Sequence, residues 1–439
     1  MCKLKNTKTS AIIIAFLMCV QPLFSQKKKD SIADEYRRSS LHIILLESKN
    51  FENSDLVLQG YHKAPFPDKY NDHRLSEVMF NPETYGLSEE EIGEKAEKDS
   101  TAKENGEKVK MAEKKTPSVI EKYFKENDIA KQMVAKWFNR QEDGTFDMSL
   151  IHERGSYDAS ALEADIAKGS IRGVAALKDA GEELIKNSFI AVNKMHFVKN
   201  EYAALAVRTA AYISADRLPK GSKLAKMAAD KVYEATKDGY SVWATSYLYQ
   251  LEWNDDIANQ FYMDMWMDKS SIDETRKQLF DTTSIFKMNY IGFEKAKSLV
   301  LIGEGKELAL IIELATVRNI DKVYTKLQKT YDVFKTKTPI YGVDPIWAKI
   351  GLKEGVEPND KFEVLEQVID KKTGLTVYKQ VGVVKVDKKN IWDNRYYMEE
   401  LGDVDDLGDE SVDGKKDIEG TYFKGSSKIE PGMLLRQVK

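Results

Sequence analysis

Stretches with apolar residues three or four positions apart predict three amphipathic helices. They occupy residues 117–140, 171–187 and 306–334, and the last is long enough to close a domain. Its apolar stripe consists of Leu308, Ile311, Ile312, Ile320, Val323, Leu327 and Tyr331. Each stripe needs a surface to cover, so we expect these helices to pack on a sheet.

Runs of alternating, β-branched or aromatic residues predict the strands of that sheet. They lie at 144–151, 188–198, 240–253 and 284–302. A further apolar run, 41–48, fits either a strand or a short helix, because periodicity does not separate the two at this length. The succession of helical and strand patterns predicts an α/β domain over residues 117–338.

An alanine-rich stretch from 201 to 240 predicts a helical hairpin within this domain. The break between its helices falls at Pro219 and Gly221, residue types that end helices. Alanine allows the two helices to approach closely. Membrane insertion is a second interpretation, against which the charged residues of the stretch argue.

After Pro339 the pattern changes to short strand-like runs separated by tight turns. The runs are 361–370, 375–387, 391–398, 420–426 and 432–438. Short strands at this spacing predict a small SH3-like β-barrel over residues 339–439. An acidic segment, 399–419, interrupts the barrel and predicts a solvated loop. It does not fit a calcium-binding EF-hand, since Leu407 and Gly414 stand where ligands are required.

The sequence therefore predicts an α+β protein: an α/β domain with an Ala-rich helical hairpin, followed by a small C-terminal barrel. Residues 26–88 are expected to form an irregular segment with one strand or short helix. Residues 89–116 are expected to be a charged low-complexity linker. From 89 to 115 there are nine acids, seven bases and no aromatic residue, a composition that buries too little apolar surface to fold by itself.

Residues 1–25 have the pattern of a secretory signal peptide, with three lysines before the apolar segment 11–24 and a small residue, Ser25, at the cleavage point. The apolar segment is short for a membrane anchor. Lipidation of Cys19 is an alternative, although Met18 occupies a position where such sites need a small residue. We expect an exported protein, periplasmic or associated with the outer membrane.

The composition limits which kinds of site and partner the chain can have. Cys2 and Cys19 are the two cysteines of the chain, so the exported part has no disulfide and no thiolate. Without residues 1–25 the net charge changes from −4 to −7, because three lysines are lost. An acidic chain argues against nucleic acid as a partner and against broad binding to anionic membrane surfaces. No later stretch is apolar enough to span a membrane. Phosphate-loop, HExxH and GxSxG motifs are missing, so we expect no metal and no cofactor.

One candidate acid/base cluster consists of His152, Glu153 and Asp158, at the end of a predicted strand. These residue types can move protons to and from a substrate. A turn with locally paired charges is the alternative interpretation.

A candidate binding cluster consists of Trp392, Arg395 and Tyr396, which are residue types that dominate interface hot spots. Their alternative role is in the barrel core or in a local salt bridge. Trp243, Trp253 and Trp392 also offer rings for carbohydrate or peptide binding if they are exposed.

Several phrases carry a resemblance to a known family. They are "RGSYDAS" (154–160), "DAGEELIKNSF" (179–189), "YLYQLEWND" (247–255), "KIGLKEGVEPNDKFEVLEQ" (349–367), "IWDNRY" (391–396) and "GMLLRQ" (432–437). From about residue 117 onward the chain resembles an uncharacterised exported protein family of the Bacteroidota. The resemblance implies export and this domain layout, and transfers no catalytic residue. In architecture the chain is also similar to periplasmic flagellar-assembly T proteins and curli-secretion G-like domains, which are envelope assembly components.

Together these observations favour a non-enzymatic interaction or assembly component of the cell envelope, with an envelope protein as its possible partner. One alternative is an envelope hydrolase acting on glycan or peptide, with its site near residues 152–158. Another is a carbohydrate- or peptide-binding module.

Overall fold

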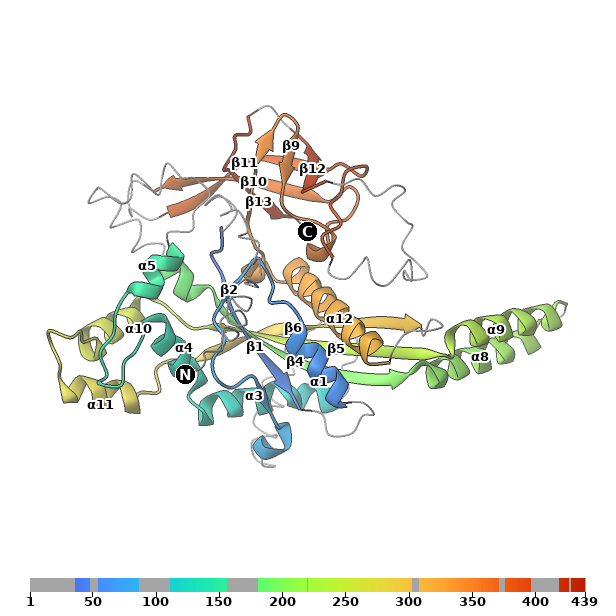
Figure 1. Cartoon of the computed structure of the whole chain (residues 1–439), viewed down its shortest axis with the longest axis horizontal. Coiled ribbons are helices and arrows are strands. Elements are labelled where there is room, and N and C mark those ends of the chain that lie inside the picture. Colours follow the sequence, from blue (N-terminus) through green and yellow to red (C-terminus); the bar gives the residue numbers. More distant parts are fainter. Residues whose placement is uncertain are drawn as a thin grey trace, which may run out of the picture.

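Two β-sheets organise the chain (Figure 1). The computed structural model describes residues 36–47, 54–86, 111–155, 181–218, 220–301, 308–370, 376–395, 418–425 and 428–438. Helices and strands are both present throughout these residues, which confirms the α+β class. The predicted signal peptide and most of the predicted linker and acidic loop lie outside the described residues.

The first sheet has the strand order β2-β1-β4-β5-β6, with β3 pairing with β1. The strands are β1 (Ser40–Leu46), β2 (Asn71–Asp72), β3 (Met79–Phe80), β4 (Ser188–Lys199), β5 (Gly239–Leu251) and β6 (Met288–Leu301). Strand β1 pairs in parallel with β4, whereas β4, β5 and β6 are antiparallel. The apolar run of β1 suits its position inside the sheet, where both faces are covered. This sheet joins the predicted N-terminal segment to the strands of the predicted α/β domain.

Helices cover both faces of the first sheet. On one face α1 (Ser54–Lys63) and α12 (Leu308–Thr330) pack on Leu41, Phe189 and Leu248. On the other face α3 (Met111–Glu126) and α4 (Ile129–Trp137) pack on Ile44 and Ile190. The predicted stripe of the long helix is confirmed by four fully or nearly buried residues, Ile312, Ile320, Val323 and Leu327.

An aromatic cluster closes one end of this sheet. It lies among α5 (Ser149–Gly155), α10 (Asp255–Gln260), the π-helical turn η3 (Phe261–Met265) and α11 (Glu274–Thr282). The predicted strand over 144–151 is wrong, because residues 149–155 form helix α5. The Asp147 carboxylate accepts a hydrogen bond from the backbone N–H of Ser149 at 2.9 Å, and such an acceptor starts a helix instead of continuing a strand.

The second sheet is antiparallel and curls into half a barrel, with the order β7-β13-β10-β11-β12-β9-β8. Its strands are β7 (Thr338–Pro339), β8 (Gly342–Val343), β9 (Ile346–Ala348), β10 (Lys361–Ile369), β11 (Thr376–Val386), β12 (Thr421–Lys424) and β13 (Leu434–Gln437). Four of the five predicted strands are confirmed. The fifth, 391–398, is wrong over its described residues 391–395, where Trp392 makes an isolated bridge with Gly351. Here Asn394 Oδ1 accepts a hydrogen bond from the backbone N–H of Lys353 at 2.9 Å.

Short 3₁₀ turns, η2 (Pro82–Tyr85), η4 (Asp332–Phe334) and η5 (Leu352–Glu354), connect these elements. Two further helices, α8 (Asn200–Asp216) and α9 (Ser222–Thr236), lie between β4 and β5. They project from the end of the first sheet, away from the second sheet (Figure 1).

Candidate functional site

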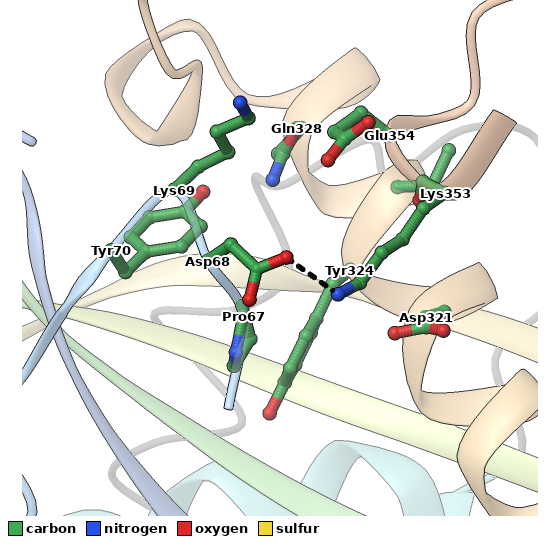
Figure 2. Close-up of a pocket in the computed structure, with 10 residues that line it drawn as sticks. Pro67, Asp68, Lys69, Tyr70, Asp321, Tyr324, Gln328, Lys353 and Glu354 are labelled. Carbon is green, nitrogen blue, oxygen red and sulfur yellow. Dashed lines mark hydrogen bonds and ion pairs between the residues drawn. The ribbon is translucent and has the colours of Figure 1, made fainter. Parts of the chain in front are cut away.

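A pocket with charged walls lies where the segment 67–70, helix α12 and turn η5 meet (Figure 2). It encloses about 310 Å³ when its open mouth is counted. Its lining residues are Pro67, Asp68, Lys69, Tyr70, Asp321, Tyr324, Thr325, Gln328, Lys353 and Glu354. The pocket therefore joins the helical layer of the first sheet to the loops of the second.

One ion pair and several hydrogen bonds link the walls of this pocket. Lys353 Nζ lies 2.9 Å from Asp68 Oδ2 (Figure 2). Lys69 Nζ donates to the backbone carbonyl of Lys349 at 2.6 Å. The Thr325 hydroxyl of α12 donates to the backbone carbonyl of Lys353 at 3.0 Å. These contacts attach the second sheet to the first domain.

Five lining groups of the pocket have shifted pKa values, and those of Asp321 and Lys69 bear on acid–base chemistry. Burial raises the pKa of Asp321 to about 7, with the Lys353 ammonium opposing and the Glu354 and Asp68 carboxylates reinforcing the shift. Burial lowers the pKa of Lys69. A carboxyl that titrates near neutrality is suited to general acid–base chemistry. The Lys69 ammonium points away from Asp321 (Figure 2), so these two groups do not form an acid/base pair.

Below the pocket, a buried hydrogen-bonded group continues into the first sheet. Asn193 on β4 donates from Nδ2 to the Tyr324 hydroxyl at 3.0 Å and to the Tyr61 hydroxyl at 3.2 Å. The pocket is thus a polar joint between layers, in which most side chains already have protein partners.

Only part of the predicted acid/base cluster lies within the described residues. His152 and Glu153 are exposed on α5, whereas Asp158 lies outside the described residues. The next residue, Arg154, points inward. Its guanidinium donates to the backbone carbonyl of Asp72 at 2.6 Å and stacks 4.8 Å from the Trp137 ring. The inward face of α5 is therefore structural, and the catalytic role of His152, Glu153 and Asp158 stays a prediction.

The predicted binding cluster is also placed in part. Arg395 pairs with Asp393, with 3.0 Å between guanidinium and carboxylate. The backbone N–H of Trp392 donates to Thr421 Oγ1, and its backbone carbonyl accepts from the N–H of Leu352. Tyr396 lies outside the described residues. Recognition by this cluster stays a prediction, beside the local salt bridge that Arg395 makes.

The other two candidate tryptophans differ in exposure. Trp253 is buried and donates to Glu182 Oε2 at 2.6 Å. Trp243 on β5 is 44% exposed, with the Lys297 ammonium 4.9 Å from its ring centroid. Of these two rings, only Trp243 is available to a ligand.

Helices α8 and α9 together form a second candidate, which we name the arm. The arm has almost no interior, because the side chains described as buried within residues 201–236 are those of Ala204, Ala215 and Ala229. These alanines form the seam between the two helices. Eight of the eighteen exposed large apolar side chains among the described residues lie on the arm or, for Leu218, just after α8: Tyr202, Leu205, Val207, Ile213, Leu218, Leu224, Met227 and Val232.

One face of the arm is ionic. Arg208 donates to Asp230 Oδ1 at 2.7 Å, and the Tyr212 hydroxyl donates to the same carboxylate oxygen at 2.6 Å. On the same face Lys226 pairs with Asp216 at 2.5 Å. These contacts run from one helix to the other and fix their register.

The opposite face of the arm has no charged residue. Because successive helical residues are 100° apart, the positions that lie across the seam from Arg208 and Asp230 can be assigned. They are Val207, Ala210, Ser214, Ala228, Val232 and Ala235. Val207 and Val232 are 59% and 51% exposed. We call this surface the charge-free face.

Sequence reasoning missed both candidate sites in different ways. Asp68, Asp321 and Lys353 come from three distant segments with no shared motif, so no local signal could have found the pocket. The arm did carry a signal. Its helices have apolar residues on more than one side, which is unusual for a helix with a single buried stripe.

The described residues contain neither a group of potential metal ligands nor a membrane-spanning helix. No three His, Cys, Asp or Glu side chains in the described ranges are grouped to hold a metal ion. None of the helices described combines the length and apolar character needed to cross a membrane.

Comparison with known proteins gives no family assignment. No protein-family model matches the chain, and no curated protein matches it.

Proposed function

We propose that this chain is an exported, non-enzymatic interaction or assembly component of the cell envelope, and that the charge-free face of the arm is its contact surface. One observation carries the proposal. Large apolar side chains are concentrated on the two-helix arm, which has no core of its own to cover them, and two of them, Val207 and Val232, lie on the charge-free face. Exposed apolar side chains concentrated in this way mark interaction sites.

Three further features support it. The sequence of residues 1–25 has the signal pattern of exported proteins. The ionic face holds the two helices in register, so the charge-free face is preformed and binding would need little ordering. Beyond its base at the end of the first sheet, the arm projects from the rest of the molecule (Figure 1), where a partner can reach it.

The proposal includes a finer description of the fold. We infer that the half-barrel of β7–β13 belongs to an SH3-like barrel and that α8 and α9 are an Ala-rich hairpin serving as a contact element. The order of the second sheet and the alanine seam support this description.

Site-specific photocrosslinking in the native envelope would test the proposed contact surface. A photoreactive phenylalanine derivative placed at Val207 or Val232 should yield one reproducible crosslinked protein. The matched control is the same group at Thr209, an exposed position on α8 that faces away from the charge-free face. Equal crosslinking from all three positions, or none from any, would contradict the proposal.

Enzymatic turnover would contradict it in another way. Hydrolysis of an envelope glycan or peptide by the purified chain, lost on His152→Ala and retained on Lys131→Ala, would establish the hydrolase alternative instead.

A further inference from the structure

The far end of the arm differs from its faces in both charge and exposure. From residue 217 to 229 there are four bases and no acid, in a chain whose net charge is −4. Leu218, Leu224 and Met227 are exposed in the same stretch, by 48%, 77% and 60%. We call residues 217–218 and 220–227 the tip.

The bases of the tip are available to an external anion. Arg217, Lys220 and Lys223 are exposed, and within the described residues none of the three is in an ion pair. Lys226 differs from them, because it pairs with Asp216. Three cations therefore lie in the same short stretch as the exposed apolar side chains, outside the ion pairs of the described residues.

The arrangement of the apolar side chains decides which kind of partner fits. Leu218 precedes the turn, whereas Leu224 and Met227 follow it and lie one helical turn apart on the outward side of α9. A protein surface that docks along one face would cover only some of them. A lipid surface that meets the arm end-on covers all of them at once.

We propose that the tip docks on an anionic lipid surface. Its leucines and methionine would enter the boundary between headgroups and acyl chains, while Arg217, Lys220 and Lys223 contact lipid phosphates. This inference extends the proposed function, because the same arm would present its charge-free face to a protein while its tip holds it to the membrane.

Vesicle binding tests this proposal with lipids alone, so its failure is separable from failure of the crosslinking experiment. The chain from residue 26 onward retains every described residue and lacks the apolar segment 11–24, which would bind lipid by itself. We expect it to co-sediment with vesicles containing 30% phosphatidylglycerol and to bind pure phosphatidylcholine vesicles at least tenfold more weakly. Raising the salt concentration from 50 to 500 mM should release it.

Two double variants separate the apolar and ionic contributions. Leu224→Gln/Met227→Gln should lower binding about tenfold, and Lys220→Gln/Lys223→Gln should lower it tenfold or more. The matched controls, Met263→Gln/Ile272→Gln and Lys269→Gln/Lys287→Gln, change exposed residues of the same types away from the arm and should bind like the unaltered chain.

A direct probe of insertion is available because the chain from residue 26 onward has no cysteine. Leu224→Cys carrying an environment-sensitive fluorophore should shift to shorter wavelength on anionic vesicles, and Met263→Cys should not. No vesicle binding by the unaltered chain, or equal losses in tip and control variants, would overturn the proposal. Binding to heparin that is as salt-sensitive, with no fluorescence shift on vesicles, would also overturn it and make the tip a general polyanion site.

Discussion

Helix α12 and the arm are both helical and both rich in apolar residues, yet they stand in opposite relations to solvent. On α12, Ile312, Val323 and Leu327 are completely buried against the first sheet. On the arm, Val207 and Leu224 are mostly exposed. The difference arises because α12 has a sheet and a neighbouring helix to cover, whereas each helix of the arm has only the other. Apolar content therefore predicts burial only where the fold supplies a partner.

The largest expected difference between the two regions is in stability. Leu327→Ala should lower the free energy of unfolding by about 2–5 kcal/mol, because it leaves a cavity in a closed core. Leu224→Ala should change it by less than about 0.5 kcal/mol, because an exposed side chain loses little. Urea unfolding of both variants measures the difference. Comparable losses would mean that the tip is covered in the free protein.

Charged residues sharpen the same comparison. Arg154→Met should cost about 2–3 kcal/mol, because Ser40 Oγ and the carbonyl of Asp72 would lose buried donors. Arg208→Met on the arm should lower the free energy of unfolding much less, since its ion pair with Asp230 is open to solvent and screened there. The urea unfolding midpoints of the two variants measure this difference. An arm variant as destabilised as Arg154→Met would show that the ionic face is essential to the whole fold.

His42 on β1 should make the protein less stable in acid. Its burial lowers its pKa from 6.5 to about 3, and the Lys136 charge adds to the shift. As the pH falls below 6.5 the unfolded chain takes up a proton that the folded chain does not, so stability is present above that pH and lost below it. Between pH 7.5 and 5 the contribution is about 2 kcal/mol. His42→Asn should remove that part of the pH dependence, and an unchanged dependence in urea unfolding would refute the assignment.

Asp321 should have the opposite effect on the pH dependence of stability. The effect should be smaller, since Asp321 is partly open to solvent. Its folded pKa of about 7 lies above the usual 3.8. The folded chain therefore retains a proton that the unfolded chain has lost, and this stability declines as the pH rises towards and through 7. Asp321→Asn should raise the urea midpoint at pH 7.5 more than at pH 5. The same increment at both pH values would mean that Asp321 is ionised in the folded protein across this range.

Local sequence patterns predicted many of the helices and strands outside the arm. The runs at 188–198, 240–253 and 284–302 correspond to strands β4, β5 and β6, and the stripe of 306–334 corresponds to α12. These predictions succeeded because each segment is long and strongly periodic. The run at 144–151 failed because a single carboxylate, Asp147, overrides alternation by starting a helix. The run at 391–398 failed over 391–395, where polar side chains bind backbone donors in place of a neighbouring strand.

The candidate sites were less accessible to prediction. His152 and Arg395 were found as residue types in a suggestive order, and the sequence also offered a local salt bridge, which Arg395 makes with Asp393. Neighbouring positions do not say which side of α5 is buried. The pocket around Asp321 depends on three segments that meet only in the folded chain.

By itself the sequence determined which segments form long helices and strands, the signal pattern at the start, the absence of cysteine after residue 25, and the basic character of residues 217–229. These properties are local, since they depend on the periodicity and composition of single stretches. Only the tertiary structure decided that β1 joins β4, that Asp68, Asp321 and Lys353 gather in one pocket, and that the arm keeps its apolar residues in solvent. Those outcomes depend on contacts between distant segments, and local sequence does not specify which surfaces will find a partner.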